Sequence, residues 1–189
     1  MADDFFDSEE NVEKYVEMAD GYDGEALIAE LRNHLPEGAS VLELGMGPGK
    51  DLDILAGTYQ VCGSDRSTAF LERYRRQQPK ADLLQLDAVT LETGRTFDAI
   101  YSNKVLHHLT RAELAESFRR QAARLNDGGL LFHSFWHGDK EESFAGMQFV
   151  YYTEETLQRV IGPEFEWVKA ELYTELDDGD SFYVILKKR

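Results

Sequence analysis

The run Val41–Lys50, which reads VLELGMGPGK, constrains the fold more than any other part of the chain. Its first four residues favour a buried strand, and Gly45, Gly47 and Gly49 follow at alternate positions before a helical pattern begins at Asp51. Glycine accepts positive φ and lets backbone N–H groups approach a ligand with no Cβ in the way. The run therefore predicts a strand that passes through a ligand-binding glycine loop into a helix.

The spacing of these glycines separates two kinds of nucleotide site. A dinucleotide fingerprint reads G-x-G-x-x-G and cradles a pyrophosphate at a helix N-terminus. Here the order is G-x-G-x-G, and Glu43 precedes the first glycine by two residues. A carboxylate there would repel a pyrophosphate, but it could meet a cationic amine or accept hydrogen bonds from ribose hydroxyls. The pattern therefore disfavours an NAD-binding oxidoreductase, although a glycine loop alone is a weak signal.

Further strands follow at regular intervals, and two of them end in an acidic residue. Tyr59–Asp65 is one, and Leu83–Ala88, which contains Asp87, is the next. Two more strand patterns follow at Thr96–Asn103 and Leu125–Phe132, with helical patterns between them. Such alternation predicts parallel strands joined by right-handed crossovers.

Taken in order, these segments resemble the motifs of class I S-adenosylmethionine-dependent methyltransferases. Five motifs in register cover roughly residues 38–135. The resemblance implies a Rossmann-like three-layer α/β sandwich with a seven-stranded, mostly parallel sheet of order 3-2-1-4-5-7-6 and an antiparallel last strand. We expect a single domain over residues 1–189, made of an N-terminal helical lid (1–36), the cofactor-binding core (38–135), and a substrate-side segment with the terminal hairpin (136–189).

The same resemblance implies S-adenosylmethionine as cofactor and assigns roles to individual residues. Asp65 is expected to bind the ribose hydroxyls and Asp87 the adenine amino group, although capping of local backbone is an alternative for both. Asn103 is expected near the methionine end of the cofactor. The cofactor-binding residues expected are Glu43, Gly45, Gly47, Gly49, Asp65, Arg66, Asp87, Ala88, Asn103 and Tyr22. Pro48 departs from the usual family loop and removes one N–H donor.

Histidines invite a catalytic interpretation. His107 and His108 lie in an L-H-H-L turn that suits packing, while His133 and His137 flank Trp136 near the expected substrate mouth. We take His108, His133 and His137 as weak candidates for a general base. No metal-ligand spacing is present, and we expect no metal.

The remaining segments predict helices and a hairpin. Ser8 is expected to cap a helix over residues 8–20, whose apolar face holds Val12, Tyr15, Val16 and Ala19. The resemblance implies that Tyr15 and Tyr22 fold over the cofactor from the N-terminal lid, with packing in the core as the alternative for Tyr15. Further expectations are a second helix near 25–35, a short helix capped by Thr153, and strands Phe165–Glu175 and Ser181–Lys187 joined by an Asp-Gly turn.

The net charge of the chain limits the kinds of partner that we expect it to bind. The chain has 189 residues, with 36 acidic against 20 basic and a net charge of −16. A nucleic-acid enzyme needs clustered cations, and the one basic cluster is Arg73, Arg75 and Arg76 with Lys80 nearby. We expect no nucleic-acid or membrane partner. The single cysteine, Cys62, is expected to be buried and inert. Since no signal peptide or transmembrane run is recognisable, we expect a cytoplasmic monomer or homodimer.

These observations favour one function. We expect methyl transfer from S-adenosylmethionine to an O, N or S atom of a small molecule, with catalysis resting mainly on alignment. The alternative is a catalytically inactive protein of the same fold that binds the cofactor. Aromatic residues within 136–152 are expected to line the acceptor site or to pack under a loop.

Overall fold

The protein is built on one seven-stranded sheet. A computed structural model describes residues 9–18, 21–144 and 146–189. The strand order is β3-β2-β1-β4-β5-β9-β8. The strands are β1 (Ser40–Leu44), β2 (Gln60–Asp65), β3 (Leu83–Gln85), β4 (Phe97–Asn103), β5 (Leu125–Trp136), β8 (Phe165–Tyr173) and β9 (Ser181–Lys188). β9 runs antiparallel to both β5 and β8, while the pairs among β1 to β5 are parallel. The predicted order 3-2-1-4-5-7-6 is thus confirmed, β8 and β9 being the sixth and seventh strands of this sheet.

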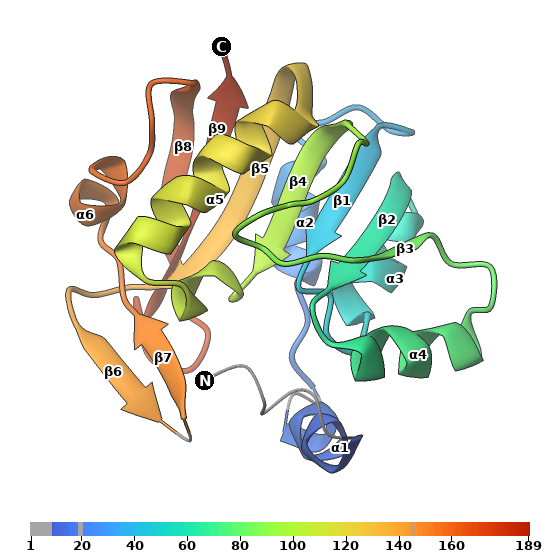
Figure 1. The fold of residues 1–189 in the computed structure, drawn as a ribbon. Coiled ribbons are helices and arrows are strands. Elements are labelled where there is room, and N and C mark those ends of the chain that lie inside the picture. The colour runs from blue at the N-terminus through green and yellow to red at the C-terminus, as the bar shows by residue number, and fades with distance from the viewer. Residues whose placement is uncertain (1–8, 19–20, 145) are drawn as a thin grey trace.

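Helices cover both faces of the sheet (Figure 1). They are α1 (Glu9–Met18), α2 (Glu25–Leu31), α3 (Lys50–Ala56), α4 (Thr68–Gln77), α5 (Arg111–Arg124) and α6 (Glu154–Gln158), with a 3-10 turn η2 (Leu106–His108). α2 and α3 share one apolar cluster with alternate residues of the central strands, while α5 and α6 share the cluster of the opposite face. This arrangement is the predicted three-layer sandwich.

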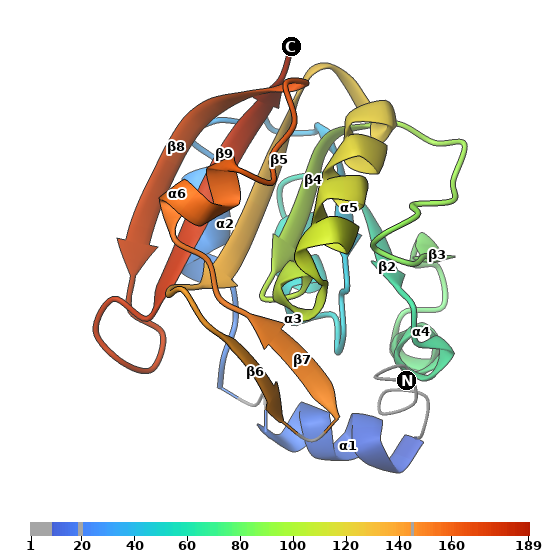
Figure 2. The ribbon, with the colours of Figure 1, turned by 60° about the vertical axis from the view of Figure 1, so that its left-hand side comes forward.

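Two elements lie beyond the carboxyl ends of the parallel strands: α1 and a small hairpin of β6 (Glu141–Phe144) and β7 (Met147–Val150) (Figure 2). In open α/β sheets, ligands bind at this end. The hairpin forms a sheet of its own. It lies within the aromatic segment 136–152, for which the sequence predicted no strands, and all four residues of β6 are exposed.

Local signals explain several element ends. Thr153 caps α6 through a reciprocal capping box with Thr156, as predicted for Thr153. The second helix ends at Leu31, four residues before the expected end, and continues as turns up to Pro36. The predicted cap Ser8 and the predicted face residue Ala19 lie outside the described residues.

Within the described ranges, no helix has both the length and the apolar run needed to cross a bilayer.

Candidate functional site

The glycine loop after β1 has the conformation that its sequence requires. Gly45, Gly47 and Gly49 have φ of +64°, +48° and +87°. A Cβ on Gly45 would lie 2.5 Å from Val105, and one on Gly49 would lie 2.3 Å from the Tyr74 ring. A Cβ on Gly47 would have no neighbour closer than 3.9 Å. The outer glycines are therefore needed for packing, whereas a Cβ on Gly47 would make only an ordinary van der Waals contact, with the Tyr15 ring of α1.

Asp65 at the end of β2 is joined directly to this loop. Its Oδ2 accepts from the Gly47 N–H at 2.9 Å, and its Oδ1 accepts from the Ser67 N–H at 2.9 Å. Burial raises the pKa of Asp65, although the two N–H donors act against this effect. Ser67, not Asp65, caps α4 by accepting from the Phe70 N–H. The expected ribose ligand thus lies beside the loop, and the N-cap position of α4 is filled by its neighbour.

Glu43, on β1 just before the loop, is only 3% exposed. Its Oε2 has no hydrogen-bond partner among the described residues. Burial, together with the charges of Asp51, Asp65 and Asp53, raises the pKa of Glu43 well above its ordinary value. An unpartnered buried carboxyl costs free energy. A ligand that brings hydroxyl or amine hydrogens to this loop would supply the donor that the Glu43 oxygen lacks.

Other predicted cofactor residues lie nearby but have local roles. Asp87 Oδ1 accepts from the N–H groups of Val89 and Thr90, at 2.7 and 3.2 Å, which closes the turn after β3. The capping alternative for Asp87 is therefore realised, and its contact with adenine stays a prediction. The Ala88 carbonyl accepts from Ser117 Oγ at 2.6 Å. Arg66 and Tyr22, which were also predicted, have exposed side chains, that of Tyr22 by 49%.

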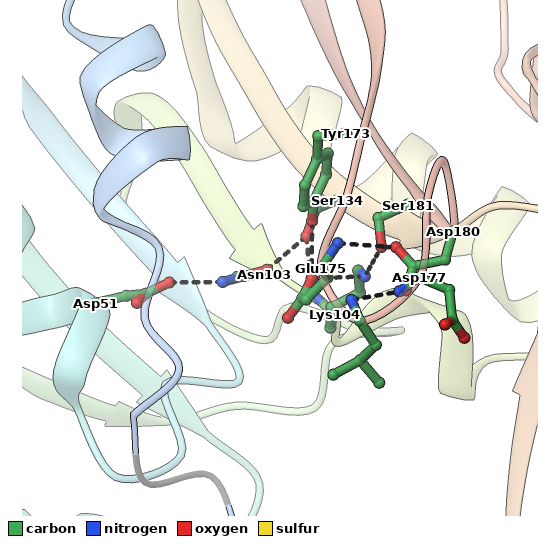
Figure 3. A network of polar contacts seen from close by, with 10 residues as sticks. Asp51, Asn103, Lys104, Ser134, Tyr173, Glu175, Asp177, Asp180 and Ser181 are labelled. Atoms are coloured by element: carbon green, nitrogen blue, oxygen red, sulfur yellow. Dashed lines mark hydrogen bonds and ion pairs between the residues drawn. The ribbon is translucent and has the colours of Figure 1, made fainter.

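Asn103 at the end of β4 belongs to a polar network that crosses the carboxyl end of the sheet (Figure 3). Its Nδ2 donates to Asp51 Oδ2 at 3.1 Å, and its Oδ1 accepts from Ser134 Oγ at 2.6 Å. Asp51 also accepts from Tyr101 Oη at 2.8 Å and from the Gly24 N–H at 2.7 Å. Asp51 was not predicted. It holds the segment before α2 against the start of α3 and fixes the rotamer of Asn103.

Lys104 is a second residue that the sequence did not reveal. It has a φ of +55°, unusual for a residue with a Cβ, at the turn from β4 into η2. Its Nζ donates to Glu175 Oε2 at 2.8 Å and to Ser181 Oγ at 2.6 Å (Figure 3). The same ammonium lies 3.4 Å from the centroid of the Trp136 ring. Burial lowers the pKa of Lys104 in spite of Glu175. Lys104 thus connects β4 to the turn before β9.

The position predicted for His133 was wrong. It is fully buried in the core, not at the mouth. Gln121 Oε1 lies 2.7 Å from Nε2, and Ser102 Oγ lies 2.8 Å from Nδ1. Because an amide oxygen can only accept, Nε2 carries the proton and Nδ1 accepts from the hydroxyl. Burial lowers the pKa of His133 to about 3. Both nitrogens serve the packing of β4, β5 and α5.

The other two candidate bases lie at the carboxyl end of the sheet. His108 Nδ1 donates to the Gln148 carbonyl of β7 at 2.9 Å. His137 Nδ1 donates to the Gly179 carbonyl at 3.2 Å. One nitrogen of each ring is thus used in holding a neighbouring segment, and a catalytic role for either stays a prediction.

Comparisons with known proteins agree with this geometry. Residues 41–129 match the methyltransferase domain family. A tRNA (carboxymethyluridine(34)-5-O)-methyltransferase of Saccharomyces cerevisiae is 30% identical over 64% of this chain and 43% of its own length. A trans-aconitate 2-methyltransferase of Variovorax paradoxus is 36% identical over 51% of this chain and 38% of its own. The chain thus spans less than half the length of either relative.

A solved structure extends the likeness to nearly the whole fold. An S-adenosylmethionine-dependent methyltransferase of Clostridium acetobutylicum superposes with a TM-score of 0.75 at 14% identity, covering 93% of this chain and 98% of that one. At such low identity the likeness concerns the fold alone. The sequence match thus places residues 41–129 in the methyltransferase domain family, and the strand order is the one expected from the resemblance to class I S-adenosylmethionine-dependent methyltransferases.

Proposed function

We propose that the protein binds S-adenosylmethionine and transfers its methyl group to an O, N or S atom of a small molecule. One observation carries this proposal more than any other. The Asp65 carboxylate accepts from the N–H of Gly47, on a loop where an added Cβ would meet no atom closer than 3.9 Å, and it lies beside the unpartnered buried carboxyl of Glu43.

Different residues would bind different parts of the cofactor. Asp65 would accept from the ribose hydroxyls, and Glu43 would meet a hydroxyl or amine hydrogen near the loop. Asp87, through the carboxylate oxygen that does not close its own turn, would accept from the adenine amino group. The bound cofactor supplies a methyl group that its sulfonium makes electrophilic.

The chain's own contribution to the transfer is alignment. Asn103 is held between Asp51 and Ser134, so its side chain is fixed at the carboxyl end of β4 without a ligand. Tyr15 of α1 passes within 3.9 Å of the position of a Cβ on Gly47, so that α1 covers the loop. Orientation of two reactants and exclusion of water can lower a barrier by ~7–11 kcal/mol without an acid or a base.

The acceptor class follows from charge and from the relatives. Trans-aconitate, named for one relative, is a small molecule, whereas the yeast relative is named for tRNA. The net charge of −16 opposes contact with phosphates, and the basic cluster on α4 is short. These observations support a small-molecule acceptor over RNA.

Calorimetry with S-adenosylhomocysteine tests the proposal. Asp65→Ala removes charge-assisted bonds worth ~1.5–3 kcal/mol, so the dissociation constant should rise roughly 10- to 150-fold. Asp82→Ala is the matched control, because Asp82 is an exposed acid paired with Arg95. Equal affinities of the two variants would remove Asp65 from the site.

Transfer itself is measured with S-adenosylmethionine labelled in the methyl group and a panel of metabolites. We expect label in at least one hydroxyl, amine or thiol compound. Tight cofactor binding with no labelled product across the panel would favour the alternative, a cofactor-binding protein without transfer activity.

A further inference from the structure

His107 is a buried imidazole that the mechanism above does not use. It lies in η2, four residues after the end of β4, and is 2% exposed. Neither of its ring nitrogens has a hydrogen-bond partner among the described residues. Burial, with His108 and Lys104 nearby, lowers the pKa of His107 well below its ordinary value, so the ring is neutral and offers one donor and one acceptor.

Three flat rings lie beside His107. Phe149 of β7 stacks on it with a centroid distance of 5.3 Å and an interplanar angle of 16°. His108 lies at 4.0 Å and Trp136 at 6.5 Å. A trapped water needs two to four polar partners, and aromatic faces do not supply them. Since buried polar groups in native proteins are nearly always bonded, the imidazole is expected to meet a ligand.

His107 lies close to the carboxyl end of β4. The Lys104 ammonium lies over the ring face of Trp136, which is a neighbour of His107. Lys104 directly follows Asn103, which lies at the carboxyl end of β4 among the residues of the proposed cofactor mouth. His107 is therefore next to that mouth.

The cover over His107 is a small hairpin, anchored in the core through the buried Val150 of β7. The β6–β7 hairpin is a separate two-stranded sheet beyond the carboxyl ends of the parallel strands (Figures 1 and 2). Its connections to the body include the Gln148 carbonyl on His108 and an exposed ion pair of Glu141 with Arg111. A two-stranded hairpin is marginally stable by itself. Lifting it would withdraw Phe149 and uncover the flat face of His107.

We propose that His107 is an acceptor-binding residue beneath this hairpin, and that the acceptor is a flat aromatic or conjugated molecule with a hydroxyl or amino group. The flat part of the acceptor takes the place of Phe149 against the imidazole. Its heteroatom hydrogen-bonds to a ring nitrogen of His107. This inference rests on the proposed function, because it names the substrate class of the same site.

Side-chain nitrogen NMR of the full chain, labelled with ¹⁵N-histidine and saturated with S-adenosylhomocysteine, tests the inference. Phenol and aniline are the probes, and toluene is the control that lacks a heteroatom. We expect the His107 nitrogens to shift with both probes and not with toluene, while those of His133 stay in place. Unmoved His107 signals in a protein that binds S-adenosylhomocysteine would overturn the inference and leave the proposed function standing. Failure to bind S-adenosylhomocysteine would count against the proposed function.

Three variants separate a binding role from a packing role. His107→Phe should keep the stack on Phe149 and remove the unpartnered nitrogens, so the unfolding midpoint rises while phenol no longer binds. A variant that is less stable than the wild type and binds phenol normally would show that His107 only packs. Phe149→Ala should lower the phenol dissociation constant severalfold by removing the cover. Phe144→Ala, on the same hairpin at a side chain that is 72% exposed, should leave it unchanged. An equal effect of the two substitutions would contradict the role of Phe149.

Discussion

Gly47 and Gly38 have similar backbones and different surroundings, so the same substitution at each separates backbone strain from ligand contact. Their φ angles are +48° and +79°, and a Cβ on either meets no atom closer than 3.9 Å. Alanine in the left-handed region costs roughly 1–2 kcal/mol, partly offset by a stiffer unfolded chain. A net cost of about 1 kcal/mol lowers the unfolding midpoint of a chain of this length by roughly 2–4 °C. We expect that drop for both Gly47→Ala and Gly38→Ala.

Ligand binding should distinguish the two variants. The Cβ at position 47 enters the space in front of the loop, whereas Gly38 lies before β1, at the opposite end of that strand. In calorimetry, the dissociation constant for S-adenosylhomocysteine should rise at least about 10-fold in Gly47→Ala, a loss of ~1.4 kcal/mol, and stay unchanged in Gly38→Ala. Gly49→Ala should instead destabilise the fold more, because its Cβ would press on the Tyr74 ring. Wild-type affinity in Gly47→Ala would refute this placement of the ligand.

Three more predictions concern charge. Glu43→Gln should weaken cofactor binding, and it should raise the unfolding midpoint at pH 8 but not at pH 4. The pKa of the wild-type Glu43 carboxyl is raised in the folded protein, so the protonated carboxyl contributes its full stability below about pH 4.5. This stability is lost as the pH rises through the pKa of the folded state. The pKa of His133 is about 3 in the folded protein and 6.5 as its ordinary value, so the unfolded chain takes up this proton more readily. The free energy of unfolding should therefore fall by up to about 2 kcal/mol as the pH is lowered from 6.5 to 5. Urea unfolding should show a smaller fall in His133→Gln, and an unchanged fall would mean that His133 is not its source. Gel-shift titrations at about 50 mM salt should detect no binding of tRNA or duplex DNA, since too few cations are available for counterion release; micromolar binding with a steep salt dependence would contradict a small-molecule acceptor.

The main sheet could be predicted because its signals are local and its family motifs lie in chain order. The glycine loop, the acidic strand ends and the Asp-Gly turn before β9 each mark the end of a strand or a turn within a few residues. Asp65 and Gly47 were both expected at the cofactor, and the structure places them in direct contact. β3 is shorter than expected, because the Asp87 carboxylate closes a turn that takes the chain away from the sheet.

The unpredicted features depend on contacts between distant parts of the chain. Asp51 and Asn103 form a hydrogen bond although they are 52 positions apart in the sequence, and Lys104 and Glu175 do so although they are 71 positions apart. No local pattern marks such pairs. His133 looked like a mouth residue because it lies near the end of a strand, but β5 continues to Trp136 and leaves the ring within the core. The β6–β7 hairpin was missed because β6 is exposed throughout and lacks the alternation of a half-buried strand.

A crystal structure with S-adenosylhomocysteine bound tests the central claim most directly. The ribose hydroxyls should lie within hydrogen-bond distance of the Asp65 carboxylate, with the ligand against Gly47 and its sulfur directed toward Asn103. The carboxyl of Glu43 should have gained a partner. A ligand bound elsewhere on the protein, or one that leaves Asp65 and Gly47 without contact, would contradict the claim.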